Sequence, residues 1–409
     1  MILGFLLKRL VGIVGKPNVG KSTFFTAATM ISVPVAAYPF TTIKPNHGVG
    51  YVRVKCVCKE IGVKDDPVNS TCINGTRMIP IELIDCAGLV PDAWKGKGLG
   101  NKFLDEIMTA DALIHVVDAS GATDVEGKIC PTGTHDPMKD IKFLDRELDM
   151  WMLRILKRDW DKILRKGKIG IDELIDSIAD RLSGLAIRRS SIENEVRKLR
   201  LMPENISSWS EENLITLIHN IRTSSKPMII AANKIDVSGS MDNVSRIEKS
   251  GHVTIPCSAE AELALRRSRQ KNLTNYEPGN DKFNILNKEK LNLEQLQGLQ
   301  KISDEILLKI GSTGIQNAIN FAFFKLLNMI TVYPIENIET FSDHKGRVLP
   351  DAYLIPYGAT AKDLASMIHT EIGKGFLYAT DARTKMRVGE DYKLKDNDLV
   401  SITSTSKRG

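Results

Sequence analysis

The feature that most constrains this chain is the glycine-rich segment GKPNVGKST at residues 15–23. It follows the apolar run LVGIV at residues 10–14 and precedes the helical pattern STFFTAATM. A strand, a G-x-x-x-x-G-K-[ST] loop and a helix in this order form a phosphate-binding loop, because backbone N–H groups and the helix N-terminus all face the phosphate. We expect Lys21 to bridge the β- and γ-phosphate oxygens and Ser22 to ligate Mg²⁺. The other expected nucleotide contacts in this loop are Asn18, Val19, Gly20 and Thr23.

The order of apolar runs along the chain predicts an α/β fold. Short runs rich in β-branched residues, such as VGYVRV, IPIELID, ALIHVVDA and PMIIAAN, alternate with helical patterns, which is typical of a doubly wound, mostly parallel sheet. We expect a P-loop domain from residues 1–129 and 223–335, a helical insertion at 130–222, and a compact β-rich module around one helix at 336–409. In the insertion, apolar residues from Ile141 to Ile155 follow helical spacing along one seam.

Bulk composition narrows the class of protein. The 409 residues carry a formal net charge of +6, and basic residues outnumber acidic ones between residues 151 and 200. Such a surplus is as typical of a solvated helix surface as of a surface for a polyanion such as RNA. No apolar run is long enough to span a membrane, and Lys8 and Arg9 interrupt the apolar opening MILGFLL. We therefore expect a cytoplasmic protein with no membrane partner.

The six cysteines are scattered without the spacing of a disulfide framework. Cys56, Cys58 and Cys72 invite comparison with a zinc site. The single residue between the first two is too short for the usual zinc knuckle, and no fourth ligand has suitable spacing. The sequence therefore favours small buried hydrophobic residues at these positions.

A second phosphate-sensing element follows the run IPIELID. In Asp85-x-x-Gly88, we expect Asp85 to hold Mg²⁺ through water and the Gly88 amide to contact the γ-phosphate. Position 89, where Ras-like GTPases keep the glutamine that orients water, is Leu89. Thr42, in YPFTTIKPN, is a candidate to complete the Mg²⁺ shell and to act with Lys21 and Gly88 in catalysis; a strand with two β-branched threonines explains the same residues.

Two later motifs predict that the base is guanine. In Asn233-Lys234-Ile235-Asp236, the Asp236 carboxylate can accept the N1–H and 2-amino donors of guanine, which adenine lacks. Asn233 can tie the base loop to the phosphate loop, and the Lys234 stem can cover the base. Further along, Ser258-Ala259-Glu260 matches a loop whose central amide meets the guanine O6.

With these motifs together, the chain resembles an Obg-family GTPase of the YchF-like branch in its archaeal form. The resemblance also rests on DCAGLVPDAWKGKGLGNKFL and on MIHTEIGKGFLYATDARTKMRVGEDY, which is similar to a TGS domain. It implies a TGS module of β-grasp shape, a hydrophobic residue in place of the catalytic glutamine, and association with ribosomes or RNA. Many YchF-like members replace the guanine-reading motif and use ATP; this chain keeps NKID, so we expect GTP.

The resemblance implies slow hydrolysis of GTP to GDP and phosphate by a regulatory switch. Alternatives are a YchF-type ATPase and an RNA- or ribosome-binding adaptor with structural nucleotide. The expected cofactor is Mg²⁺, and Asn18 is a candidate ligand for K⁺, which would stabilise charge on the β–γ bridge as an arginine finger does, or it merely shapes the loop. Arg383, Lys385 and Arg387 would share a face if they lay in one strand, as RNA contacts or as solvated residues.

Overall fold

A computed structural model describes residues 9–31, 46–86, 88–95, 100–158, 160–165, 170–185, 187–200 and 203–405. The chain divides into two compact units. The P-loop unit comprises Leu10–Gly48 and Leu83–Ala318. The C-terminal unit comprises Met1–Arg9, Val49–Glu82 and Ile319–Gly409. The division expected from the sequence, with limits at 129/130, 222/223 and 335/336, stays a prediction about domains.

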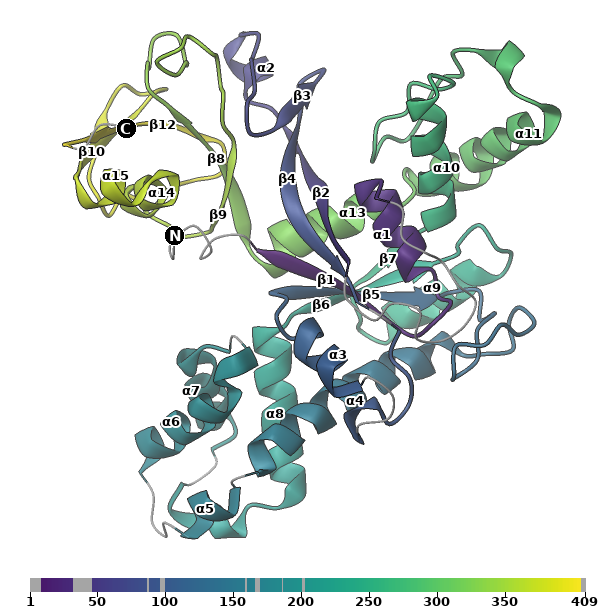
Figure 1. The fold of residues 1–409 in the computed structure, drawn as a ribbon, viewed down its shortest axis with the longest axis vertical. Coiled ribbons are helices and arrows are strands. Elements are labelled where there is room, and N and C mark those ends of the chain that lie inside the picture. Colours follow the sequence, from purple (N-terminus) through teal and green to yellow (C-terminus); the bar gives the residue numbers. More distant parts are fainter. Residues whose placement is uncertain are drawn as a thin grey trace. The chain divides into compact units, whose positions relative to one another are not determined.

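The larger sheet is mostly parallel, as the sequence pattern predicts (Figure 1). Its order is β2-β4-β1-β5-β6-β7, with β3 paired to β4 in antiparallel fashion. The strands are β1 Leu10–Val14, β2 Asn46–Lys55, β3 Thr71–Ile73, β4 Thr76–Asp85, β5 Ala112–Asp118, β6 Met228–Asn233 and β7 Thr254–Pro256. Every residue of β5 is buried, as expected for a central parallel strand covered on both faces. The chain of β2 and of β4 runs from one unit into the other.

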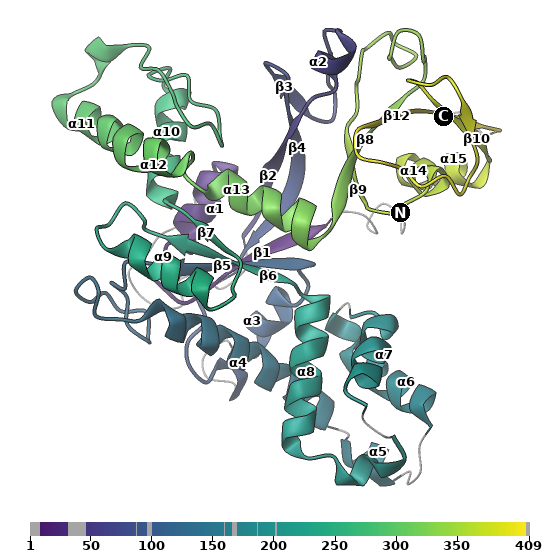
Figure 2. The same cartoon turned by 180° about the vertical axis from the view of Figure 1, so that it is seen from behind.

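Because β1, β5 and β6 are parallel neighbours, their carboxyl ends lie in one row. Val11 pairs with Ala112 across β1 and β5, and Asp118 pairs with Asn233 across β5 and β6. Helices α1 Lys21–Thr29 and α10 Ala259–Gln270 lie on one side of these strands, and α3 Gly100–Ile107 and α4 Pro137–Lys157 lie on the other (Figures 1 and 2). The loops that leave the carboxyl ends of β1, β5 and β6 therefore meet at one edge, where α/β sheets bind ligands.

Between β5 and β6 the structure places a group of helices around one apolar core. They are α4, α5 Trp160–Arg165, α6 Ile171–Leu182, α7 Arg189–Lys198 and α8 Glu211–Ser225. Helix α4 begins with an Asp136 side-chain cap and a proline in its first turn, and α8 begins with a Ser210–Asn213 capping box. The α4 seam is buried as its spacing predicts: Leu144 and Leu148 join the insertion core, and Ile141 packs beside β5 and β6.

The remaining described helices of the P-loop unit follow β6. They are α9 Ser240–Lys249, α11 Leu293–Lys301, α12 Leu308–Ile310 and α13 Ile315–Phe321, the last of which continues into the C-terminal unit. In the described part of the chain, no helix combines the length and apolar character that crossing a membrane requires.

The C-terminal unit contains a separate five-stranded sheet of order β11-β10-β12-β8-β9. Its elements are β8 Met329–Ile335, β9 Tyr353–Pro356, α14 Ala361–Ile368, α15 Thr370–Lys374, β10 Phe376–Asp381, β11 Arg387–Val388 and β12 Asp398–Ser404. Strands β8 and β12 are parallel and the other pairs are antiparallel. The expected mixture of strands around a helix is present, and the sheet takes in β8, which the sequence-based limit at residue 336 leaves outside.

Candidate nucleotide-binding site

The phosphate loop has the backbone shape that its glycines allow. Gly15 has φ of +145°, and a Cβ there would lie 2.4 Å from the Val116 carbonyl oxygen. Gly20 has φ of +96° and closes the loop just before α1. The Lys21 ammonium turns back over the loop and donates to the Lys16 carbonyl at 2.7 Å. The described loop is therefore folded as a cradle with its lysine in place.

Burial lowers the pKa of Lys21 to about 8, against the raising effect of the nearby Asp85 carboxylate. The side chain is almost fully shielded from solvent, so its charge lacks the hydration it would have at the surface. A phosphate group in the cradle would supply the compensating negative charge. The site is thus tuned to an anionic ligand.

Two of the three expected Mg²⁺ ligands, Ser22 and Asp85, are brought together. Ser22 Oγ, at the start of α1, donates to Asp85 Oδ2 at the end of β4 over 3.1 Å. Asp85 is 1% exposed, and its other oxygen, Oδ1, has no hydrogen-bond partner among the described residues. Burial raises the pKa of Asp85, while Lys21 and Ser22 act in the opposite direction. A buried carboxylate oxygen without a partner beside a hydroxyl is a fitting donor set for Mg²⁺.

Gly88 and Leu89 have different surroundings. A Cβ on Gly88 would lie 2.7 Å from the Pro17 backbone nitrogen, so only glycine allows this segment to approach the phosphate loop. The Leu89 N–H donates to the Gly15 carbonyl at 3.1 Å, and its side chain is buried in the core with Val14. Leu89 therefore serves packing and does not face the cradle. Thr42, the other expected γ-phosphate sensor, lies outside the described residues, as does Thr41.

Asn233 joins three loops. Its Nδ2 donates to the Val19 carbonyl at 2.9 Å, and its Oδ1 accepts from the Ala259 N–H at 2.9 Å. Both bonds are buried, and a Cβ on Gly20 would lie 2.3 Å from Nδ2. This is the link between base loop and phosphate loop that the NKID motif leads us to expect.

Asp236, the carboxylate expected to contact the base, is held by a neighbouring loop. Ser258 Oγ donates to Asp236 Oδ1 at 2.7 Å, and the same Ser258 side chain caps α10 through the Ala261 N–H. One oxygen of Asp236 is thereby oriented. Glu260 is exposed in the first turn of α10, and no hydrogen bond among the described residues joins it to Asp236 or Ser258.

Lys234 has a partner that the sequence analysis missed. Its ammonium forms an ion pair with Asp118 at the end of β5, with 2.8 Å between Nζ and Oδ2. Burial alone would raise the pKa of Asp118, but hydrogen bonds from Lys234, Ser120 and Thr123 outweigh it and hold the pKa below its usual range. The signal was present in the sequence, since Asp118 ends an apolar strand as Asp85 does.

A second missed element is the segment after β5, which lies against the phosphate loop. The Lys16 ammonium is buried and donates to the carbonyls of Thr123 and Asp124 and to Asp140 of α4. Asn18 has φ of +60° and donates from Nδ2 to the Gly127 carbonyl at 2.9 Å. These bonds give Asn18 a loop-shaping role in the structure, while its role toward K⁺ stays a prediction.

Arg383, Lys385 and Arg387, the candidate RNA contacts, do not share one face of a strand. Arg383 and Lys385 lie in the turn between β10 and β11, so only Arg387 is in a strand. Arg383 pairs with Glu60, Lys385 pairs with Glu339, and Arg387 lies over the Tyr378 ring. Alternation fails here because the chain reverses at these positions.

The basic surplus of residues 151–200 is partly neutralised within the insertion. Arg189 forms ion pairs with Asp172, Asp176 and Glu193, and Arg197 pairs with the same Glu193. This arrangement favours the solvated helix surface over a dedicated polyanion surface.

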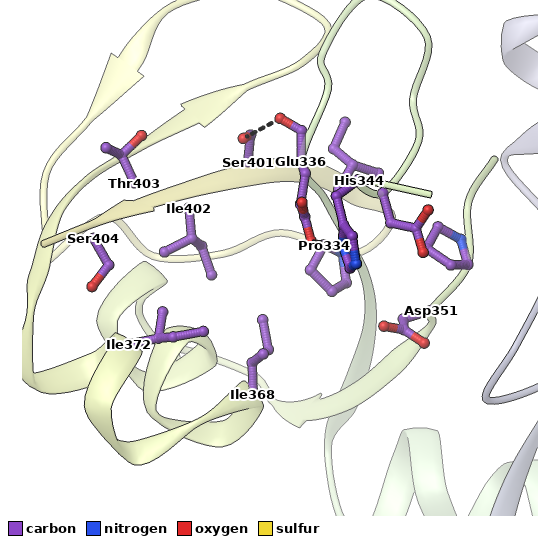
Figure 3. Close-up of a pocket in the computed structure, with 13 residues that line it drawn as sticks. Pro334, Glu336, His344, Asp351, Ile368, Ile372, Ser401, Ile402, Thr403 and Ser404 are labelled. Carbon is purple, nitrogen blue, oxygen red and sulfur yellow. Dashed lines mark hydrogen bonds and ion pairs between the residues drawn. The ribbon is translucent and has the colours of Figure 1, made fainter. Parts of the chain in front are cut away.

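The C-terminal unit has a pocket of its own, of about 520 Å³. Figure 3 shows Ile368, Ile372 and Ile402 on one side, with carboxylates on the other. Its acidic lining residues are Glu336, Asp343 and Asp351. Asp343 pairs with Arg347 and Glu336 pairs with His344, and none of the described residues that line this pocket belongs to a phosphate-binding loop, so the loops of the P-loop unit remain the candidate site for a nucleotide.

Comparisons with known proteins agree with these features. Family models match residues 10–151 as a 50S ribosome-binding GTPase, residues 231–337 as the Obg-like GTPase YGR210-like, G4 motif-containing domain, and residues 345–404 as a TGS domain. A GTP-binding protein of Methanocaldococcus jannaschii is 48% identical over 400 residues, which are 97% of this chain and 100% of that protein.

Two further relatives span nearly the whole chain. The ribosome-binding ATPase YchF of Haemophilus ducreyi is 30% identical over 417 residues, covering 95% of this chain and 97% of that protein. The crystal structure of a GTP-binding protein from Pyrococcus horikoshii OT3 has a TM-score of 0.75 and 39% identity, covering 97% of this chain and 99% of the other.

Proposed function

Because the chain belongs to the Obg-like, YchF-related family of P-loop GTPases with a TGS domain, we propose that it binds GTP with Mg²⁺ and hydrolyses it slowly to GDP and phosphate. We further propose that this hydrolysis times its association with the ribosome or RNA. The single observation that carries the nucleotide part is the Asn233 bridge between Val19 and Ala259, with Asp236 held beside it by Ser258.

The base-binding part of the proposal follows from donor and acceptor chemistry. Asp236 accepts from the N1–H and the 2-amino group of guanine. The Ala259 N–H, the expected donor to O6, donates to Asn233 Oδ1 in the structure, so in the guanine complex O6 would have to share or replace that bond. Adenine presents an acceptor at N1 and no 2-amino group, so the Asp236 carboxylate would keep only the Ser258 hydroxyl as a donor among the described residues. Leaving a charged acceptor without a donor from the base costs about 1–3 kcal/mol or more, which favours GTP over ATP by about fivefold or more.

At the phosphates, Lys21 binds the β- and γ-oxygens, and the Gly88 N–H contacts the γ-phosphate. Ser22 and Asp85 hold Mg²⁺, which when bound neutralises charge on the β- and γ-phosphates. Leu89 cannot orient water, so we expect unassisted turnover on the order of 10⁻⁴–10⁻² s⁻¹. K⁺ bound near Asn18 is our candidate for the missing positive charge; equal single-turnover rates in K⁺ and Na⁺ buffers would remove it.

The deciding experiment is calorimetric titration of the full chain with GTP, GDP and ATP. We expect Asp236→Asn to lose guanine nucleotides and to gain xanthosine triphosphate, because the asparagine amide can donate to the xanthine 2-carbonyl. Asp242→Asn is the matched control, since Asp242 is an exposed carboxylate in the first turn of α9. Equal affinity for ATP and GTP, or no binding of either, would refute the proposal and in the first case favour the ATPase alternative.

Association with ribosomes is proposed from the name of the YchF relative and tested separately. The Lys21→Ala variant, which loses the phosphate-binding ammonium, is compared with the unaltered chain in co-sedimentation with ribosomes. Loss of nucleotide-dependent co-sedimentation supports a switch. Unchanged co-sedimentation of both proteins favours the adaptor alternative, in which nucleotide is structural.

A further inference from the structure

Three of the six cysteines and one carboxylate converge in the C-terminal unit. Cys56 directly follows β2, Cys58 begins the short helix α2 Cys58–Ile61, and Cys72 lies in β3. Asp65 comes from the loop between α2 and β3, which lie side by side in Figures 1 and 2. One ligand atom from each of these four residues lies within 4.8 Å of all the others. Cysteine spacing alone does not reveal Asp65 as the fourth donor, because the fold brings its carboxylate to the cysteines.

Two of the distances between donor atoms match the edges of a tetrahedron around one ion, and all the donor atoms lie within 4.8 Å of one another. The Sγ atoms of Cys58 and Cys72 are 3.9 Å apart, and Cys56 Sγ is 3.3 Å from an Asp65 oxygen. With Zn–S near 2.3 Å and Zn–O near 2.0 Å, tetrahedral edges are roughly 3.8 Å between sulfurs and roughly 3.5 Å between sulfur and oxygen. Cys56 and Cys58 are 1% and 4% exposed, as in a closed structural site. We propose a structural Zn²⁺ site with these donors: Cys56, Cys58, Asp65 and Cys72.

Arg77 supplies an independent reason for negative charge at this place. Its side chain is 0% exposed, and Asp65 is its one ion-pair partner in the described structure, at 3.7 Å. Its Nε has no hydrogen-bond partner among the described residues. Three thiolates and a carboxylate around Zn²⁺ carry a net charge of about −2, which compensates the buried guanidinium. Arg77 also orients the Asp65 carboxylate, as outer-shell groups do around metals.

The backbone is shaped to present the donors without metal. Asn74 and Gly75 both have positive φ, at +53° and +82°, and form the tight turn of the β3–β4 hairpin. The Cys56 N–H donates to the Gly75 carbonyl at 2.8 Å, which holds the end of β2 against this turn. Gly62, at φ of +70°, ends α2 and lets the chain return toward Asp65.

The site would connect two parts of the C-terminal unit. The N–H groups of Asp66 and Val68 donate to the carbonyls of Val348 and Pro350, at 2.8 and 2.7 Å. Arg77 donates to the Leu349 carbonyl at 2.7 Å. The loop that carries Asp65 is therefore attached to the segment that precedes β9. Zinc would join the residues between β2 and β4, which carry all four donors, to this segment.

The competing arrangement is a Cys58–Cys72 disulfide. A disulfide requires sulfurs about 2.0 Å apart and would use two of the four donors, so Cys56 and Asp65 would keep only their contact with each other and the ion pair of Asp65 with Arg77. Counting thiols and zinc in the same preparation separates the two arrangements.

The test measures zinc in the full chain, purified without a metal-affinity tag, by elemental analysis and by mercurial-induced release to a chromogenic chelator. We expect about one zinc per chain, and its near-complete loss in Cys72→Ser and Asp65→Ala. Cys130→Ser is the matched control, because Cys130 lies outside the cluster in the P-loop unit, and it should retain the metal. GDP affinity of Cys72→Ser should stay unchanged, which shows that the P-loop unit remains folded.

Cobalt provides a second readout that needs no variant. Chelator-stripped protein titrated with Co²⁺ should develop the sulfur-to-cobalt charge-transfer and tetrahedral ligand-field bands at one equivalent, and Zn²⁺ should displace them. Reduced thiols with neither zinc nor a cobalt spectrum would overturn the proposal. So would an intact mass showing a Cys58–Cys72 disulfide, or zinc retained by both cluster variants.

Discussion

Replacing Asn233 by alanine tests whether the base loop and the phosphate loop bind nucleotide as one unit. The substitution removes both buried bonds of the side chain and strands the Val19 carbonyl and the Ala259 N–H. Each stranded buried group costs about 1–3 kcal/mol, so the total loss for the two groups should be about 2–6 kcal/mol. If half of this falls on the nucleotide complex, GDP affinity drops roughly 5- to 140-fold.

The matched control is Asn320→Ala in the C-terminal unit. Asn320 also bridges a backbone N–H and a carbonyl, both of Arg53, at 2.9 and 2.7 Å. Each variant therefore removes an asparagine side chain that donates to one backbone carbonyl and accepts from one backbone N–H. We expect both to lower the free energy of unfolding in urea, and only Asn233→Ala to lower GDP affinity.

A third variant separates the two bonds of Asn233. In Asn233→Asp, the oxygen that accepts from Ala259 is kept, while the donor to Val19 becomes an acceptor facing a carbonyl. Calorimetry should then show weakened GDP binding although the Ala259 bond persists. The reasoning is wrong if Asn233→Ala binds GDP within about threefold of the unaltered chain while it loses as much stability as Asn320→Ala.

Three further predictions concern the same unit. Lys21 has a pKa of about 8 in the free protein, and a bound phosphate raises this pKa. Nucleotide binding at pH 8 should therefore take up about half a proton, and nucleotide affinity should fall as the pH rises above 8. Calorimetry in buffers of different ionisation enthalpy measures the proton uptake. At pH 6.5 this group should contribute almost no uptake, and an uptake independent of pH would contradict it. Leu89→Gln should lower unfolding stability by about 2–4 kcal/mol without raising the single-turnover rate, because position 89 points into the core; a faster rate would show that the side chain reaches the cradle. Lys16→Met should lower the free energy of unfolding in urea by about 3 kcal/mol, because Asp140 then keeps only His135 as a side-chain partner among the described residues, whereas an unchanged midpoint would mean that the ion pair is dispensable.

The sequence predicts those parts of the site that act through contiguous residues. The loop from Gly15 to Thr23 needs its glycines and its lysine within one turn, so its pattern reveals both fold and ligand. The NKID motif is similar, because Asn233 and Asp236 leave the same strand end. Ser22 and Asp85 meet because each follows or precedes a strand of one parallel sheet.

Contacts between distant segments could not be read in this way. The ammonium of Lys16 finds Asp140 at a separation of 124 residues, and Lys234 finds Asp118 at 116. The residues next to Lys16 and Lys234 in the sequence do not predict which carboxylate each lysine contacts. Strand β8 is a uniformly buried run whose pairing with β12 depends on residues after position 397, so its place in the C-terminal sheet follows only from the fold.

The segment after Gly88, which has Leu89 where Ras-like GTPases have glutamine, is attached to the helical insertion. Glu147 of α4 is buried and accepts from the N–H groups of Asp92 and Trp94, at 2.9 and 3.0 Å, while Leu89 packs into the same core as α4. The loop that would sense the γ-phosphate is thus fastened to the helical insertion by one carboxylate and one apolar side chain. A shift of Gly88 toward phosphate must either break these bonds or move α4 with it. Leu89 therefore connects this loop to the insertion, and in the hydrolysis proposed above water would be oriented by other groups.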